Sequence, residues 1–179
     1  MINFRTVEIA DIPQIVDIYN SNSKFLINHL GVKQVDDKFI LNELDKMSEF
    51  NFSSYVILDS NNSIIGVIDY KIEYDEIYLS LIMIHSRLQN KGLGALTYNV
   101  FERKIRKLIN LNYNTLSKNS VMRVDVINDY TPNLVKYWSS RGFHWCEEIE
   151  LEWGEKKSIA VVMKKSLKLN DRKKVRLKA

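Results

Sequence analysis

The sequence predicts a single α/β (α+β) domain, a mixed, mostly antiparallel, twisted sheet of about seven strands flanked by about four helices. Runs with strand-like alternation are interspersed with amphipathic stretches in which apolar residues recur every three or four positions. Three of the strand-like runs follow one another with only short turns between them, which is typical of an antiparallel meander. We expect the domain to span residues 1–165 and a basic tail to occupy residues 166–179.

The first part of the chain predicts one strand followed by helices. Residues 3–7 alternate as a short strand, and Asp11 and Pro13 are typical of a helix start. Residues 20–35 predict either a short helix or a loop that covers a substrate, and residues 36–50 predict a second helix. The apolar face of the first helix is expected to contain Ile12, Ile15, Val16 and Tyr19.

The middle of the chain predicts the meander and a long helix. A helix is expected to begin near Gly94 and to run to about Leu111, and the asparagine-rich residues 110–120 predict a loop. The three strands of the meander are expected at residues 54–59, 64–72 and 77–84.

The last part predicts a further helix between strands. Thr131 and Pro132 are typical of a helix start, the helix is expected to end at Ser139, and Gly142 is expected to adopt a left-handed conformation after it. Strands are expected at residues 121–127, 144–153 and 158–164, the last two joined by a turn at Gly154.

Composition excludes several classes of protein. The 179 residues are 45% hydrophobic, which suffices for one sizeable core, and no apolar run reaches the roughly 18 residues of a membrane-spanning helix. The amino terminus lacks the features of a signal peptide. Cys146 is the one cysteine, so it cannot form an internal disulfide, and we expect it to be buried. We therefore expect a cytoplasmic protein with no membrane partner.

The basic charge of the chain is concentrated at its end. The net charge is +4, but residues 164–179 contain eight Lys or Arg and one Asp, which leaves the rest of the chain at about −3. A nucleic-acid-binding domain would be expected to carry basic residues over a folded face. Nucleic acid is therefore not expected as a partner.

The most informative stretch is QNKGLG, Gln89 to Gly94, which lies between a predicted strand and a predicted helix. Such a turn directs several main-chain N–H groups and the positive end of the helix dipole at one place, which suits a phosphate or pyrophosphate. It is not a Walker A loop, because no Gly-Lys-Ser/Thr follows. It is not a dinucleotide fingerprint either, because Thr97 stands where a third small residue is needed.

This spacing resembles motif A of the GNAT superfamily of N-acetyltransferases, Gln/Arg-x-x-Gly-x-Gly/Ala. The resemblance implies acetyl-CoA as co-substrate, with its pyrophosphate bound mostly through main-chain N–H groups of the loop. It also implies that the main chains of Met83 and Ile84, on the preceding strand, bind the pantetheine arm and help to polarise the carbonyl. The implied cofactor-binding residues of the loop are Gln89, Asn90, Lys91, Gly92, Leu93 and Gly94. No spacing of His, Cys and Asp predicts a metal site.

The stretch NDYTPNLVKYWSSRGF, residues 128–143, resembles motif B of the same family, in which Asn128 would lie near the pantetheine or the substrate. Many members have a Tyr four residues before the glycine that protonates the leaving thiolate. Here Trp138 holds that register and Tyr137 precedes it, and one residue turns a helix by about 100°. We expect Trp138 to anchor the helix. For Tyr137 two interpretations stay open, a re-aimed general acid or a second anchor.

The resemblance implies an N-acetyltransferase that moves an acetyl group from acetyl-CoA to a primary amine by direct transfer in a ternary complex. Glu76 is the candidate base, and a solvated acidic turn is the alternative interpretation of that residue. The acceptor class is a small-molecule amine, a peptide N-terminus or a lysine, and a homodimer is left open. Because Trp138 occupies the usual Tyr position, a non-catalytic, regulatory acyl-CoA-binding module is the alternative function.

Overall fold

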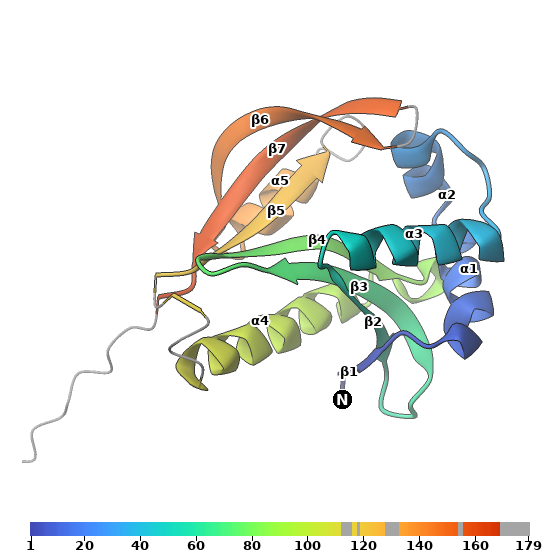
Figure 1. Cartoon of the computed structure of the whole chain (residues 1–179), viewed down its shortest axis with the longest axis horizontal. Coiled ribbons are helices and arrows are strands. Elements are labelled where there is room, and N and C mark those ends of the chain that lie inside the picture. The colour runs from blue at the N-terminus through green and yellow to red at the C-terminus, as the bar shows by residue number, and fades with distance from the viewer. Residues whose placement is uncertain (112–115, 118, 128–132, 154–155, 169–179) are drawn as a thin grey trace, which may run out of the picture.

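Seven strands and five helices make up the computed structural model, which describes residues 1–111, 116–117, 119–127, 133–153 and 156–168 (Figure 1). The strands are β1 (Asn3–Thr6), β2 (Ser53–Leu58), β3 (Ile64–Ile72), β4 (Glu76–Ile84), β5 (Val121–Ile127), β6 (His144–Trp153) and β7 (Lys156–Ser166). The helices are α1 (Ile12–Ser21), α2 (Ser23–Phe25), α3 (Asp37–Glu49), α4 (Leu93–Leu111) and α5 (Asn133–Ser139), with short turns η1 (Ile9–Asp11), η2 (Leu26–Leu30) and η3 (Ser86–Leu88).

The strands form one sheet in the order β1-β2-β3-β4-β5-β7-β6. β4 and β5 are parallel, and every other neighbouring pair is antiparallel. The predicted mixed, mostly antiparallel seven-stranded sheet is thus confirmed. Of the two interpretations of residues 20–35, the short helix is the correct one, since α2 and η2 lie there.

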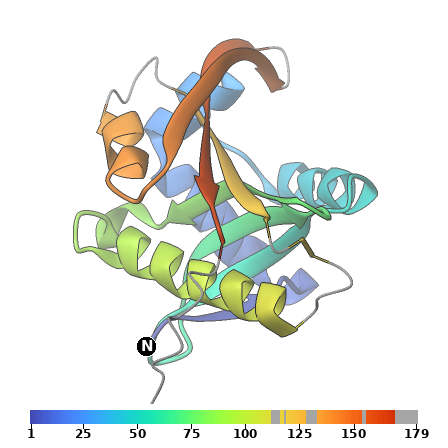
Figure 2. The ribbon, with the colours of Figure 1, turned by 90° about the vertical axis from the view of Figure 1, so that its left-hand side faces the viewer.

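Helices cover both faces of the sheet because strand side chains alternate between the faces. Val67 of β3 packs in one apolar cluster with residues of α1 and α3, such as Ile15 and Ile40. The next residue, Ile68, packs in the other cluster with Tyr98 and Phe101 of α4 and with residues of α5. α1 and α3 therefore lie on one face, and α4 and α5 on the other (Figure 2).

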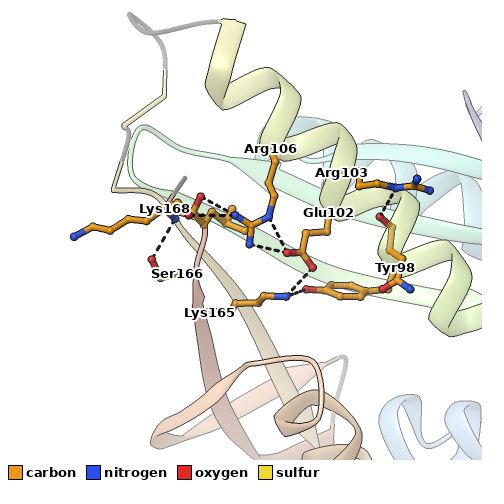
Figure 3. A network of polar contacts seen from close by, with 9 residues as sticks. Tyr98, Glu102, Arg103, Arg106, Lys165, Ser166 and Lys168 are labelled. Carbon is orange, nitrogen blue, oxygen red and sulfur yellow. Dashed lines mark hydrogen bonds and ion pairs between the residues drawn. The ribbon is translucent and has the colours of Figure 1, made fainter. Parts of the chain in front are cut away.

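A polar network fixes α4 against β7 (Figure 3). The Glu102 carboxylate accepts a hydrogen bond from Lys165 Nζ at 2.7 Å and forms an ion pair with Arg106 Nη2 at 2.7 Å. Arg106 also donates to the Leu167 carbonyl at 2.9 Å, and Lys165 donates to the Tyr98 hydroxyl at 3.2 Å. Because these side chains are largely shielded from water, the network holds the helix in one position along the strand.

β4 and β5 pair over only three residue pairs, from Glu76 opposite Val121 to Tyr78 opposite Arg123. Just beyond, the pairing of β4 with β3 skips Ser80, which leaves an extra residue in β4. Such a bulge bends a strand. The second half of β4 therefore departs from β5, and the two strands diverge (Figure 1).

Two details differ from the sequence-based expectations. Cys146 is exposed, not buried, because β6 is an edge strand and its pairing with β7 skips this residue. The Asp11 carboxylate accepts from the Glu8 N–H at 2.8 Å and pairs with Arg5, so it caps η1 instead of α1. No helix in the described ranges is both long enough and apolar enough to span a membrane. The predicted positions of Asn128, Thr131, Pro132, Gly154 and most of the basic tail lie outside the described residues.

Gly66 permits β3 and β4 to approach closely. A Cβ atom at this position would overlap the Met83 carbonyl and lie 3.0 Å from the side chains of Ile57 and Ile84. We expect Gly66→Ala to lower the free energy of unfolding by about 1–3 kcal/mol, because the added methyl group would force the paired main chain of β4 to shift. Urea unfolding measures the change. Gly94→Ala is the matched control, since a Cβ there meets nothing within 4 Å. Equal stability of the two variants would contradict the prediction.

Candidate active site

An open groove of about 400 Å³ lies between the end of β4, the start of α4 and the helix α5. The structure therefore brings together the two segments that the sequence linked to a cofactor, although they lie far apart in the chain. The residues that line the groove are Ile82, Ile84, Gln89, Asn90, Gly92, Gly94, Ala95, Leu134, Tyr137 and Trp138.

The loop before α4 presents unpaired main-chain N–H groups. Within the described residues, none of the N–H groups from Asn90 to Ala95 has a hydrogen-bond acceptor, and the first one bonded is that of Leu96, to the Gly92 carbonyl at 3.0 Å. Asn90 and Gly92 are left-handed, with φ of 59° and 77°. A turn of this kind at a helix start concentrates partial positive charge. The loop is therefore suited to an anion.

The space beside the main chain of the two glycines is not filled by other protein atoms. A Cβ atom at Gly92 or Gly94 would meet no atom within 4 Å. Gly92 is explained by its positive φ, which favours glycine. Gly94 is helical and lines the groove, so neither conformation nor packing requires it to be glycine. The open space at Gly94 fits a group that approaches the backbone from outside the chain.

The Gln89 side chain anchors the loop. Its Nε2 donates to the Asn22 side-chain oxygen at 2.7 Å and to the Ile84 carbonyl at 2.9 Å. Asn22, just after α1, also donates to the Ile84 carbonyl, at 3.2 Å. Lys91 is exposed. Sequence reasoning missed Asn22, for which the available signal was only its position at a helix end.

The main chain of β4 alternates between its two sides. The His85 N–H donates to the Ile65 carbonyl of the β3 side, whereas the Ile84 carbonyl points the other way, to Gln89 and Asn22. By this alternation the main chains of Ile82 and Ile84 face the gap that opens where β4 and β5 diverge. The main chain of Met83 faces β3, opposite Val67. The Met83 side chain is buried under α1 and α3.

The closed end of the gap between β4 and β5 is filled by charged side chains. Glu76 accepts from Lys164 Nζ at 2.6 Å and lies 3.7 Å from Arg123. Arg123 in turn donates to both oxygens of Asp125, at 2.8 and 2.9 Å, and its guanidinium lies 5.1 Å from the Tyr78 ring centroid. Burial, with help from Asp125, raises the pKa of Tyr78. Glu76 is thus paired with cations at the closed end and does not line the groove.

The aromatic residues of α5 take different places. Trp138 packs edge-to-face on Tyr98 and Phe143, with ring centroids 5.3 and 5.2 Å away, as an anchor would. Tyr137 lines the groove, and the Arg141 guanidinium lies over its ring at 4.1 Å from the centroid. Arg141 therefore holds the ring of Tyr137 in place from one side.

Two histidines near the site are engaged by neighbours. His85 Nδ1 accepts from the Arg87 N–H at 3.2 Å, and its Nε2 lies 3.1 Å from an Asp17 oxygen. His29 stacks on Phe25, at 4.3 Å between ring centroids. Burial and the nearby Lys156 charge lower the pKa of His29 to about 4, so it is neutral at pH 7.

A smaller cavity, of about 30 Å³, lies on the other face of the sheet, under α1 and α3. It is mostly apolar but contains two carboxyl groups and two hydroxyl groups, those of Asp69, Glu43, Tyr19 and Ser54. Asp69 is 6% exposed. The Ser54 hydroxyl lies beside it and favours its charged form, although no contact of that hydroxyl meets full hydrogen-bond geometry within the described residues.

Burial raises the pKa of Asp69 from 3.8 to about 6, and the charge of Glu43 acts in the same direction. Between these pH values the folded protein keeps a proton that the unfolded chain releases. The free energy of unfolding should therefore fall as the pH rises through this window, by about 2–3 kcal/mol.

Asp69→Asn removes this titration. We expect the variant to be more stable than the wild type above pH 6 by about 1–3 kcal/mol, with a smaller difference at pH 4. Urea unfolding of both proteins at pH 4 and pH 8 measures the effect, because all other titrating groups cancel in the comparison. Asp45→Asn, on the exposed side of α3, is the control. Parallel pH profiles for wild type and Asp69→Asn would contradict the assignment.

Solved structures of N-acetyltransferases share this fold. Spermidine N-acetyltransferase from Vibrio cholerae, solved with CoA and spermine, has a TM-score of 0.66 at 15% identity, with 93% of this chain and 95% of that chain covered. A GNAT superfamily phosphinothricin acetyltransferase from Sinorhizobium meliloti, solved with acetyl-CoA, gives 0.61 at 13%, covering 93% and 89%. The ribosomal-protein-S18-alanine N-acetyltransferase from Escherichia coli gives 0.60 at 11%, covering 97% and 98%.

No curated protein matches the sequence significantly. Residues 15–121 match the family model described as the Acetyltransferase (GNAT) family. The match covers more than half of the chain and includes β4, the loop before α4 and α4 itself. It confirms the resemblance carried by the QNKGLG loop. The chain therefore belongs to the GNAT family of acetyltransferases.

Proposed function

We propose that this protein transfers an acetyl group from acetyl-CoA to a primary amine, directly and within a ternary complex. The observation that carries the proposal is the row of unpaired N–H groups from Asn90 to Ala95 beside the gap between β4 and β5. An anionic pyrophosphate satisfies these donors, and the open space at Gly94 accommodates it. Asn90, Lys91, Gly92, Leu93 and Gly94 then bind the cofactor, while Gln89 holds the loop in shape.

The pantetheine arm extends from the loop into the gap. There the main chains of Ile82 and Ile84 offer the hydrogen-bonding groups that β5 would otherwise take. We assign the pantetheine contacts to these two residues in place of Met83, whose main chain faces β3. Asn128 lies outside the described residues, and its contact with the pantetheine stays a prediction. Main-chain N–H groups of β4 would also stabilise the developing oxyanion of the thioester carbonyl.

In the transfer step the amine nitrogen forms a bond to the carbonyl carbon, and the bond from that carbon to sulfur breaks. The thiolate that leaves takes a proton, and we assign its donor as Tyr137, since this phenol lines the groove while Trp138 is engaged in packing. Glu76 is a weaker candidate for the base than the sequence indicated, because its carboxylate is bonded to Lys164 at the closed end of the gap. The acceptor reacts as the neutral amine, after its ammonium form has released a proton to water. Once bonded to the carbonyl carbon, the nitrogen releases a second proton to water, and Tyr137 regains a proton from the solvent.

The acceptor is an amine by this proposal. The structurally similar proteins include acetyltransferases named for spermidine and for the alanine of a ribosomal protein. Both small amines and peptide N-termini therefore belong in an acceptor screen. The screen should follow the release of free CoA thiol, with acetyl-CoA binding measured separately by calorimetry. Binding without thiol release from any amine would favour a non-catalytic module, and absence of CoA binding would refute the proposal.

Gly94→Ala tests the cofactor loop. A methyl group at this position would occupy the space assigned to the pyrophosphate, so we expect acetyl-CoA to bind about 10- to 100-fold more weakly, with unchanged thermal stability. Calorimetric titration with acetyl-CoA measures the loss. Asn99→Ala, an exposed position further along α4, is the matched control. Unchanged affinity in Gly94→Ala would exclude this loop as the pyrophosphate site.

Tyr137→Phe tests the proton donor. We expect kcat to fall by about 100-fold, with little change in the affinity for acetyl-CoA, because only the proton transfer to the thiolate is lost. Single-turnover kinetics with the best acceptor of the screen provides the measurement. Tyr74→Phe makes the same chemical change at an exposed turn residue and should leave kcat as in the wild type. A wild-type kcat in Tyr137→Phe would assign the residue to packing.

A further inference from the structure

We infer that the cavity lined by Asp69, Glu43 and Tyr19 binds an alkylammonium group of the acceptor, so that the preferred acceptors carry a second positive charge. The inference rests on the proposed transfer reaction and specifies its substrate class. It concerns the face of the sheet under α1 and α3, opposite the groove assigned to the cofactor.

The cavity contains a buried carboxylate. Asp69 is almost completely buried, and the groups that act on its charge are the Ser54 hydroxyl and the carboxylate of Glu43. Glu43 already accepts from Lys46 Nζ at 2.9 Å, so Asp69 is the group that an incoming cation would neutralise. No cation forms an ion pair with Asp69 in the part of the chain that the structure describes. A buried carboxylate without a cation is costly. An ammonium group in the cavity would remove that cost and give the Ser54 hydroxyl a donor to accept from.

The size of the cavity and the chemistry of its walls suit an alkylammonium group. The cavity of about 30 Å³ can hold a group the size of one or two waters. Around the polar groups the walls are apolar and aromatic, including Phe25, Phe39 and Leu30. Aromatic faces attract cations, and apolar side chains accommodate methylene groups. A primary ammonium on an alkyl chain fits this combination better than a metal ion, which would require more oxygen ligands.

The position of Asp69 relative to the gap between β4 and β5 also favours this assignment. Asp69 pairs with Leu81 of β4, next to the bulge at Ser80 where β4 leaves β5. Two strand spacings, about 10 Å, separate Asp69 from the gap in which the thioester would lie. Phe25 adjoins η2, and the Ile27 carbonyl of η2 receives Lys156 Nζ of β7 at 3.3 Å. One short helical segment therefore extends from the cavity to the strands beyond the gap. An extended diamine could place one nitrogen at Asp69 and the other in the gap.

The test compares 1,6-diaminohexane with 6-amino-1-hexanol, which has the same reactive amine and length but no second charge. At pH 8 we expect the wild type to acetylate the diamine with a kcat/KM about 10- to 100-fold higher. In Asp69→Asn this ratio should fall to about one, while kcat/KM for the amino alcohol and the affinity for acetyl-CoA stay unchanged. Asp45→Asn, which removes an exposed charge from α3, should retain the wild-type ratio.

The same ratio in the wild type and in Asp69→Asn would overturn the inference. If no amine is acetylated at all, the transfer proposal fails. Direct binding of the diamine then tests whether the cavity holds an ammonium group. Calorimetry should then show 1,6-diaminohexane binding the wild type at least about 10-fold more tightly than Asp69→Asn. Equal affinities would show that the cavity holds only water. Unfolding of the variant would not account for either result, because Asp69→Asn is expected to be more stable than the wild type at pH 8.

Discussion

The short pairing between β4 and β5 is the constraint on which the rest of the structure depends. If the two strands stayed paired beyond Tyr78 and Arg123, the main chain of β5 would form hydrogen bonds with the main-chain groups of Ile82 and Ile84. No gap would then exist. The bulge at Ser80 bends β4 at the point where the two strands separate. β4 then leads directly into the loop before α4, so the gap and the unpaired N–H groups adjoin each other.

A strand with a free edge inside a domain needs support, and here the support comes from residues far apart in the chain. The side chains of Asn22 and Gln89 both donate hydrogen bonds to the Ile84 carbonyl, the last acceptor of β4 that faces the gap. The main-chain N–H of Ile84 stays available. On the other side Gly66 lets β3 lie close against Met83. The strand is therefore held firmly along one edge while the other edge stays open, which is the arrangement that a binding site on a sheet requires.

The sequence predicted the order of the elements and the position of the glycine-containing loop before α4, because both depend on local patterns. Periodicity located the strands and the long helix α4, and the spacing of Gly92 and Gly94 identified the loop. It did not predict which main chains face the gap, since Ser80 shifts the register of β4 and no residue type marks such a bulge. Nor did it predict the ion pair of Glu76 with Lys164 or the role of Asn22, since both join segments distant in sequence.

The groove on one face of the sheet and the small cavity on the other differ in electrostatic character. On the side of α4 and α5, the N–H groups from Asn90 to Ala95 and the nearby Arg141 favour an anion. On the side of α1 and α3, the buried carboxylate of Asp69, which has no cationic partner among the described residues, favours a cation. The gap between β4 and β5 joins these faces, so an anionic cofactor and a cationic acceptor can approach from opposite sides. The cost of burying Asp69 without a partner then has a physical explanation, since a carboxylate already stripped of water binds an ammonium more strongly than an exposed one does.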